Sequence, residues 1–259
     1  MKQSKHNIAV IGDACIDKFV YCECKRLCPE APVPVLDVVR VTENQGMAGN
    51  VVENVKALNG SCHTTVNENC NKITKTRYVD DKTNHIFIRI DHAEKIEPIQ
   101  EDLIEAILEL ESSFDAIIIS DYRKGFLTEE SISKLAKAKC PTFLDTKKKL
   151  GLWAKDIDFI NINKGEFEAS EYEINLYNLY PKIIQTLGPD GAEYQGTNYP
   201  VKEVEVKDLS GAGDTFLAGL VVEYLNTKDI HKAILYANKC ASKVVSRKGV
   251  SYVKPEDIE

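Results

Sequence analysis

A chain of 259 residues with a formal net charge of −7 is long enough for one domain, or two small ones, with a core that needs no disulfides. Its acidity argues against a nucleic-acid partner, because a phosphate backbone attracts a clustered basic face. No apolar run approaches the roughly 18 residues of a membrane span, so we expect no membrane partner. Eight cysteines without a secretory signal indicate reduced thiols, and we expect a cytoplasmic protein.

Short apolar runs alternate with amphipathic patterns, which predicts an α/β domain with a largely parallel sheet. Asn50 is a candidate cap for the first helix, Gly60 ends that helix, and Thr128 caps a later one. The remaining predicted elements are strands at 8–11, 116–119, 142–144, 159–162 and 183–187, and helices at 101–110, 213–225 and 230–246.

Two segments interrupt this alternation. Residues 32–41 and 74–90 are rich in Val, Ile, Thr, Tyr and Phe, and no helix separates their strands. They predict antiparallel β-structure set apart from the main sheet, which we interpret as a small lid over the site. Because bare β-edges are sticky, we expect a homodimer in which lid segments pair. Cys22, Cys24 and Cys28 lack a fourth ligand at zinc spacing, and we interpret them as thiols in a loop or β-segment.

The stretch that carries most chemistry lies just before an apolar helix and reads Asp208-Leu209-Ser210-Gly211-Ala212-Gly213-Asp214. Glycines there let the backbone approach a ligand, and the free N–H groups of the helix start attract negative charge. Asp214 in the same turn provides a general base beside this anion hole, as phosphoryl transfer to an alcohol requires. The alternative interpretation is a simple helix cap, with Asp214 favoured by the helix dipole.

These seven residues match D-x-[ST]-G-A-G-D, the signature of the ribokinase/PfkB family of carbohydrate kinases, and the resemblance runs from Ile8 to Val253. It implies one ribokinase-like kinase domain over residues 1–259, an α/β fold whose mostly parallel central sheet is flanked by helices and carries a small β lid. It also implies ATP as co-substrate, Mg²⁺ and a small-molecule sugar or sugar phosphate as partner. Asp208 becomes a candidate ligand of a monovalent cation such as K⁺. The implied catalytic residues are the base Asp214 and the anion-hole residues Gly211, Ala212 and Gly213.

Further family elements follow in order. Asn163-Lys164-Gly165-Glu166 resembles the N-x-x-E element that helps place magnesium and phosphate, although a helix N-terminal Glu is the alternative. Residues 186–191 resemble the T-x-G-x-x-G turn near the nucleotide phosphates, and alone they read as an Asp-Gly hairpin turn. Asn238 matches the position beside adenine; the alternative is a helix-surface Asn. The resemblance thus implies Glu166 as a water-mediated Mg²⁺ contact and, for the nucleotide, Asn163, Thr186, Gly188, Gly191 and Asn238.

Two carboxylates follow the first strand, and ligands bind open α/β sheets at the carboxyl ends of strands. These are Asp13 and Asp17, and the resemblance places Asp17 at the family's sugar-binding Asp. The segment from Gln45 to Asn50 looks like the family's G-G-A-A-N element, which makes Gly46 and Asn50 candidate sugar contacts.

Three phrases are close to those of bacterial heptose-7-phosphate kinases, which act in making ADP-heptose for lipopolysaccharide. Residues 26–35 resemble R-x-S-P-E-A-P-V-P-V, residues 120–125 resemble S-D-Y-x-K-G, and residues 144–147 resemble D-P-K. A phosphorylated sugar requires cations, and the candidates at strand ends are Arg123, Lys124 and Lys147.

The chain also departs from these relatives, which carry a further strand and helix after the first helix. Here only the polar stretch 61–72 lies before the next β-segment, so we expect an internal deletion at the edge of the main domain. Two alternatives therefore stay open: a kinase for another sugar or a nucleoside, and a degenerate member that binds sugar or nucleotide without turnover.

Overall fold

The computed structural model of the chain describes residues 5–110, 113–247, 249 and 251–257. Its main sheet contains β1 (Ile8–Gly12), β4 (His63–Val66), β7 (Ala116–Asp121), β8 (Thr142–Thr146), β9 (Phe159–Asn163), β10 (Ile183–Thr186), β11 (Ala192–Tyr194) and β12 (Thr197–Tyr199). These strands lie in the order β12-β11-β10-β9-β8-β7-β1-β4. Neighbours from β10 to β4 are parallel, whereas β11 and β12 are added antiparallel. The predicted class, an α/β domain with a mostly parallel sheet, is confirmed.

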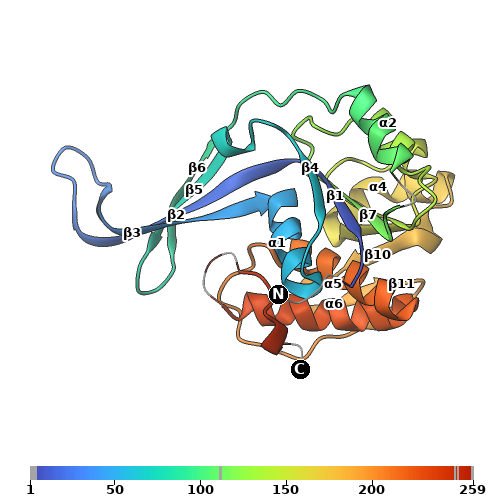
Figure 1. Cartoon of the computed structure of the whole chain (residues 1–259). Helices are drawn as coiled ribbons and strands as arrows, with labels where there is room; N and C mark the ends of the chain where they lie inside the picture. Colours follow the sequence, from blue (N-terminus) through green and yellow to red (C-terminus); the bar gives the residue numbers. More distant parts are fainter. Residues whose placement is uncertain (1–4, 111–112, 248, 250, 258–259) are drawn as a thin grey trace.

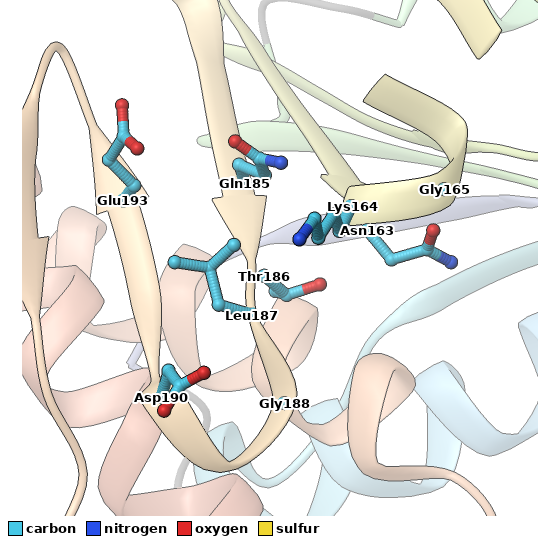
Figure 2. A pocket seen from close by; sticks show the side chains of 9 residues that line it. All are labelled: Asn163, Lys164, Gly165, Gln185, Thr186, Leu187, Gly188, Asp190 and Glu193. Atoms are coloured by element: carbon cyan, nitrogen blue, oxygen red, sulfur yellow. The ribbon is translucent and has the colours of Figure 1, made fainter. Parts of the chain in front are cut away.

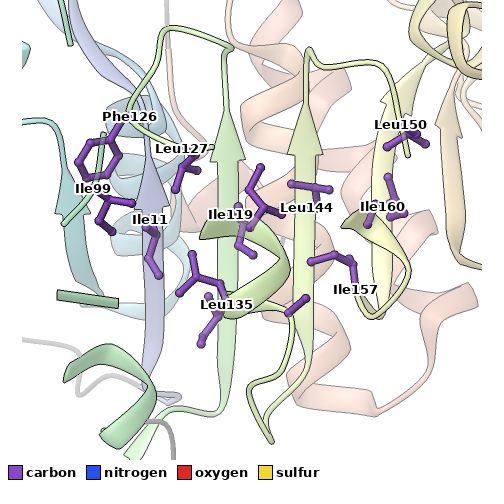
Figure 3. Packing of buried hydrophobic residues seen from close by; sticks show 14 of the residues in the cluster. Ile11, Ile99, Ile119, Phe126, Leu127, Leu135, Leu144, Leu150, Ile157 and Ile160 are labelled. Carbon is purple, nitrogen blue, oxygen red and sulfur yellow. The ribbon is translucent and has the colours of Figure 1, made fainter. Parts of the chain in front are cut away.

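Helices cover both faces of this sheet (Figure 1). They are α1 (Ala48–Asn59), α2 (Glu101–Glu109), α3 (Glu129–Leu135), α4 (Lys164–Leu176), α5 (Ala212–Thr227) and α6 (Ile230–Val245). Alternate residues of the buried strands point to opposite faces, so one strand contributes side chains to two hydrophobic cores. Ile119 and Leu144 pack with residues of α2, α3 and α4 (Figure 3), and Ile118 and Phe143 pack with α1, α5 and α6.

The lid is a second sheet that extends away from the main domain in Figure 1. Its strands are β2 (Ala14–Leu27), β3 (Pro34–Met47), β5 (Thr74–Asp80) and β6 (Ile86–His92), in the order β3-β2-β5-β6. The two predicted segments, 32–41 and 74–90, fall largely within it. The expectation of purely antiparallel pairing is wrong, because β2 and β5 run parallel. The sequence interpretation also missed β2 as a strand of the lid, and Cys22 and Cys24 lie on it.

Helix ends follow the predicted caps with one exception. Thr128 forms a reciprocal capping box with Ser131, and Gly60, at φ 95°, follows α1. The expectation that Asn50 caps α1 is wrong. The helix begins at Ala48, with Met47 as its N-cap, and no side chain caps it. Asn50 therefore lies inside the first turn, where its amide is available to the site.

The polar stretch 61–72 contains a strand that its composition did not indicate. β4 pairs in parallel with β1 and forms one edge of the main sheet. Its residues are exposed or half-buried, as expected for an edge strand that faces water. The edge portion is therefore shortened but not lost, because a strand is kept and only a 3₁₀ turn at Cys70–Lys72 follows it. None of the helices in the described ranges is long and apolar enough to cross a membrane.

Candidate active site

The start of α5 is an open helix end. Gly211 precedes the helix at φ 81°, a left-handed conformation that favours glycine. A Cβ atom added to Gly213 would meet nothing within 4 Å, so the first turn has free space above it. Ala212 donates its N–H to the Leu209 carbonyl at 3.3 Å, a long hydrogen bond at the limit of good geometry. This turn can hold an anion with its backbone amides.

Asp214 lies in that turn and is only 7% exposed. Its Oδ1 accepts a hydrogen bond of 2.5 Å from the Tyr122 hydroxyl, and its Oδ2 accepts one of 2.9 Å from Asn50 Nδ2. Burial raises the pKa of Asp214 to about 6, and the two hydrogen bonds oppose this rise. Asp214 is therefore mostly ionised at neutral pH and retains enough basicity to accept a proton.

A pocket of about 210 Å³ lies against Asp214. It is lined by residues of both the lid and the main domain, namely Asp17, Met47, Asn50, Lys75, Arg77, Arg89, Tyr122, Ser210, Gly211 and Asp214. Since the lid forms one wall, a ligand held here contacts both sheets.

The predicted sugar-binding residues separate into two groups. Asp17 and Asn50 line the pocket, and Gly46 makes room for Asp17, because a Cβ atom at Gly46 would come within 2.5 Å of Asp17 Oδ2. Asp13 does not line the pocket. Its buried carboxylate accepts the backbone N–H groups of Tyr122, Lys124 and Phe126 at 2.8, 3.1 and 3.1 Å. Asp13 thus holds the loop after β7 in place.

The predicted cations are not the ones at the pocket. Arg123 and Lys124 are exposed and are not among its lining residues. Lys147 forms ion pairs with Asp145 at 3.3 Å and Glu166 at 2.7 Å. Burial alone would lower the pKa of Lys147, but these two carboxylates raise it above its ordinary value.

Three basic residues of the lid occupy the position expected for those cations, and the sequence interpretation missed them. Lys75 and Arg77 lie on β5 and Arg89 lies on β6. The register pairs Asp17 with Lys75 and Arg77 with Arg89, and alternation along a strand puts all of them on one face. The spacing Lys-x-Arg in a predicted strand was the available signal, but only the pairing of β5 with β6 shows that the side chains converge.

A second, more open pocket of about 620 Å³ lies where β9 and β10 end (Figure 2). It is lined by Asn163, Lys164, Gly165, Gln185, Thr186, Leu187, Gly188, Asp190 and Glu193. Three residues predicted to bind nucleotide, Asn163, Thr186 and Gly188, are therefore brought together. The turn from β10 to β11 is the predicted hairpin. Gly191 supports it, because at φ 90° a Cβ atom would lie 2.0 Å from the Tyr199 carbonyl oxygen.

Asn238 lines neither pocket. Its Nδ2 donates a hydrogen bond of 2.7 Å to the Tyr199 carbonyl, and the side chain is buried. The alternative of a helix-surface Asn is therefore wrong. Asn238 connects α6 to β12, on the same hairpin that Gly191 supports.

The fit of a magnesium ion depends on Glu166. Its carboxylate already accepts the Asn163 N–H at 2.9 Å within a capping box and pairs with Lys147. The described residues contain no group of three or more His, Cys, Asp or Glu side chains suited to a metal ion. Mg²⁺ bound to nucleotide phosphates needs only one or two protein carboxylates and keeps several waters. Glu166 directly follows Asn163, Lys164 and Gly165, which line the open pocket, and it fits a contact of that kind, through water.

Asp208 offers a single carboxylate to a monovalent cation. Its Oδ1 accepts the Ser210 N–H at 2.8 Å, which shapes the turn before α5. The K⁺ assignment therefore stays a prediction.

Residues 51–257 match the pfkB family carbohydrate kinases. The chain belongs to this family. Its members are phosphotransferases that act on a sugar hydroxyl, and the protein is accordingly a carbohydrate kinase.

Curated relatives include the bifunctional protein HldE of a Nitratiruptor species, 28% identical over 298 positions that cover 98% of this chain. The HldE protein of Escherichia coli O9:H4 is 28% identical over 302 positions that cover 97% of the chain. The chain spans 64% and 62% of these two relatives, less than two thirds of their length. Because the alignments are longer than 259 residues, the chain carries gaps against both, in keeping with an internal deletion.

Solved structures share the fold at low identity. The ribokinase of Thermotoga maritima matches with a TM-score of 0.74 and 18% identity, and 98% of each chain is covered. Phosphofructokinase-2 of Escherichia coli, in complex with potassium, has a TM-score of 0.71 and 12% identity, with 98% of this chain and 96% of that chain covered. The Arabidopsis thaliana ribokinase, complexed with ribose and ATP, has a TM-score of 0.68 and 15% identity, with 98% and 97% covered. These matches confirm the ribokinase-like fold.

Proposed function

We propose that this carbohydrate kinase transfers the γ-phosphoryl group of ATP to a hydroxyl of a sugar that already carries a phosphate, a heptose 7-phosphate on the route to ADP-heptose and lipopolysaccharide. The observation that supports it best is that Lys75, Arg77 and Arg89 line the same pocket as Asp214. The matches to HldE proteins over nearly the whole chain support the same acceptor.

Charge is the reason that these cations favour a phosphorylated acceptor. A protein of net charge −7 repels a sugar phosphate unless local cations outweigh its field. Arg77 is paired with Asp17 at 2.5 Å and Arg89 with Asp91 at 2.7 Å, whereas Lys75 forms no ion pair with any described residue. Lys75 is thus the cation most available to a phosphate. Neutral hydroxyls need only hydrogen-bonding groups such as Asp17 and Asn50.

The transfer step follows from the geometry around Asp214. The acceptor hydroxyl gives its proton to the Asp214 carboxylate, and its oxygen forms a bond to the γ-phosphorus as the bond to the leaving ADP oxygen breaks. The amides of Gly211, Ala212 and Gly213 stabilise the negative charge on the transferring group. The aspartate is a suitable base because its pKa, raised by burial to about 6, lies close to neutral pH.

The nucleotide is assigned to the open pocket at the ends of β9 and β10, with Asn163, Thr186 and Gly188 near its phosphates. Bound Mg²⁺ would neutralise phosphate charge, and Glu166 would hold it through water. Lys147 pairs with Glu166 and also lowers the pKa of Asp214 electrostatically. Lys147 can therefore contact the phosphoryl group between the two pockets.

A substrate panel with one matched pair of lysine variants tests the proposal. Heptose 7-phosphate should be used far better than the unphosphorylated heptose, other sugars or nucleosides. Lys75→Met should lower kcat/KM for the phosphorylated acceptor about 10- to 100-fold, as expected for loss of a hydrogen bond to a charged group. Lys18→Met, which removes a lysine paired with Glu43 on the same lid, serves as the control and should change little. Equal use of phosphorylated and plain heptose would overturn the assignment, and absence of any turnover would favour a non-catalytic member.

A further inference from the structure

Tyr122 follows β7, and its hydroxyl reaches the carboxylate of Asp214 at 2.5 Å. This is a short charge-assisted O–H···O⁻ hydrogen bond. Burial, followed by the negative charge of Asp214, raises the pKa of Tyr122 well above its ordinary value, so the hydroxyl keeps its proton and remains a donor. Phosphoryl transfer itself requires a base and an anion hole, and it leaves this tyrosine without an assigned role.

The backbone of Tyr122 is fixed independently of its side chain. Its N–H donates to Asp13 Oδ2 at 2.8 Å, and the same carboxylate holds two further N–H groups of the loop. Asp13 is fully buried and donates its own N–H to the Ser120 carbonyl at 3.2 Å. These hydrogen bonds hold the backbone of the loop in place, and the loop positions the tyrosine toward Asp214.

The ring of Tyr122 is close to two cations, one from the lid and one from the main domain. The Lys75 ammonium of the lid is 5.2 Å from the ring centroid, and the Lys147 ammonium of the main domain is 5.6 Å from it. Both distances are within the range of a cation–π contact, about 6 Å. Tyr122 thus contacts the base through its hydroxyl and the lid through its ring.

We propose that Tyr122 is a positioning residue of the transfer reaction, which holds the Asp214 carboxylate through its hydroxyl and connects the base to the lid through the contact of its ring with Lys75. This role rests on the proposed function, in which Asp214 is the base. A residue that only filled space would need the ring alone, whereas here the hydroxyl and the ring each have a charged partner in the pocket.

The proton affinity of Asp214 depends on every titratable or charged group that faces it. These groups are Cys15 and Asp17 of β2, Lys75 and Arg77 of β5, Arg89 of β6, Tyr122, Asp145 and Lys147. Tyr122 and Asn50 are its only hydrogen-bond donors among the described residues. Removing the tyrosine hydroxyl alone therefore changes one donor and leaves these charges in place.

Tyr122→Phe tests the role of the hydroxyl, with Tyr172→Phe on the exposed face of α4 as its control. The pKa of Asp214, followed by ¹³C NMR of labelled aspartate and assigned through Asp214→Asn, should rise by about one to two pH units in Tyr122→Phe only. The acid limb of the kcat profile should move by the same amount, so turnover lost at pH 7 should recover at higher pH while KM for the acceptor stays constant. The NMR titration needs no acceptor, and its result is independent of which sugar is the substrate.

Tyr122→Leu tests the ring contact. It should show the pKa of Tyr122→Phe and, in addition, faster amide hydrogen exchange over residues 74–80 of the lid, because the contact with Lys75 is gone. Circular dichroism checks that each variant is folded. An unchanged pKa of Asp214 in Tyr122→Phe, or a rise in KM without a shift of the acid limb, would overturn the positioning role. Equal lid exchange in the Phe and Leu variants would overturn the connection to the lid.

Discussion

The residue that decides whether this chain is an active kinase is Asp214. An amide in place of its carboxylate has a single acceptor oxygen, so it can keep the hydrogen bond from Tyr122 or from Asn50 at its present position but not both, and it cannot take a proton from the acceptor. Asp214→Asn should therefore lower turnover by about 10²- to 10⁴-fold and keep nucleotide binding, measured by calorimetry with ADP. Asp156→Asn, at an exposed position, is the control. Near-normal turnover of Asp214→Asn would contradict the assigned mechanism.

Burial of Asp214 also makes a prediction about pH. The pKa of this base is raised to about 6, and the reaction needs the ionised form. The rate constant kcat/KM should therefore be close to its maximum at neutral pH and fall tenfold per pH unit below about pH 6, as the carboxylate gains a proton. A rate profile from pH 4.5 to 8, with a fluorescence check for unfolding, measures this. Undiminished activity at pH 5 would show that Asp214 is not the titrating base.

At the scale of single elements, the motif at the start of α4 can serve as a helix cap or as a magnesium contact. Two glutamate variants of α4 distinguish these roles. Glu166→Gln keeps a side chain that can accept the Asn163 N–H but removes the ion pair with Lys147 and the negative charge. If Glu166 holds Mg²⁺ through water, the Mg²⁺ concentration for half-maximal activity should rise about tenfold or more. Glu168→Gln, two residues further along α4 and exposed, should leave the titration unchanged. Identical titrations of both variants would leave Glu166 with only its structural role.

The elements also show why some parts of the site could be predicted and others could not. The strand β7 begins with the continuous apolar run Ala116–Ile119, and the motif before α5 is local, so both can be seen in the sequence. β4 is polar because it lies at an edge of the main sheet. β2 mixes polar and apolar residues because its first part is largely buried and its last four residues are exposed. The lid cations escaped prediction for a different reason: Lys75 and Arg89 lie on separate strands, and only β-sheet pairing brings them to one pocket.

At the scale of the whole molecule, the lid has two chemically different faces. The inner face carries the cations of the pocket. The register aligns Val41 with Val20, Val20 with Tyr78 and Tyr78 with Ile88, which puts these four side chains in one row across the opposite face. Val41 is 47% exposed and Ile88 is 51% exposed, so this outer row is apolar and uncovered at both ends. Its two outermost strands, β3 and β6, are also edges of the lid sheet.

Open edges and an apolar row favour association, because an open edge can form backbone hydrogen bonds with a strand of a second copy and the apolar row leaves water when that copy covers it. We therefore predict a homodimer formed through the lids about a two-fold axis. Light scattering at micromolar concentration should give about twice the 29.0 kDa of one chain. Ile88→Glu, which places a charge in the row, should return the mass to that of a monomer, whereas Leu152→Glu, at an exposed apolar position outside the lid, should not. A monomeric wild-type chain would contradict the predicted dimer, and a dimer that Ile88→Glu leaves intact would show that the interface lies elsewhere.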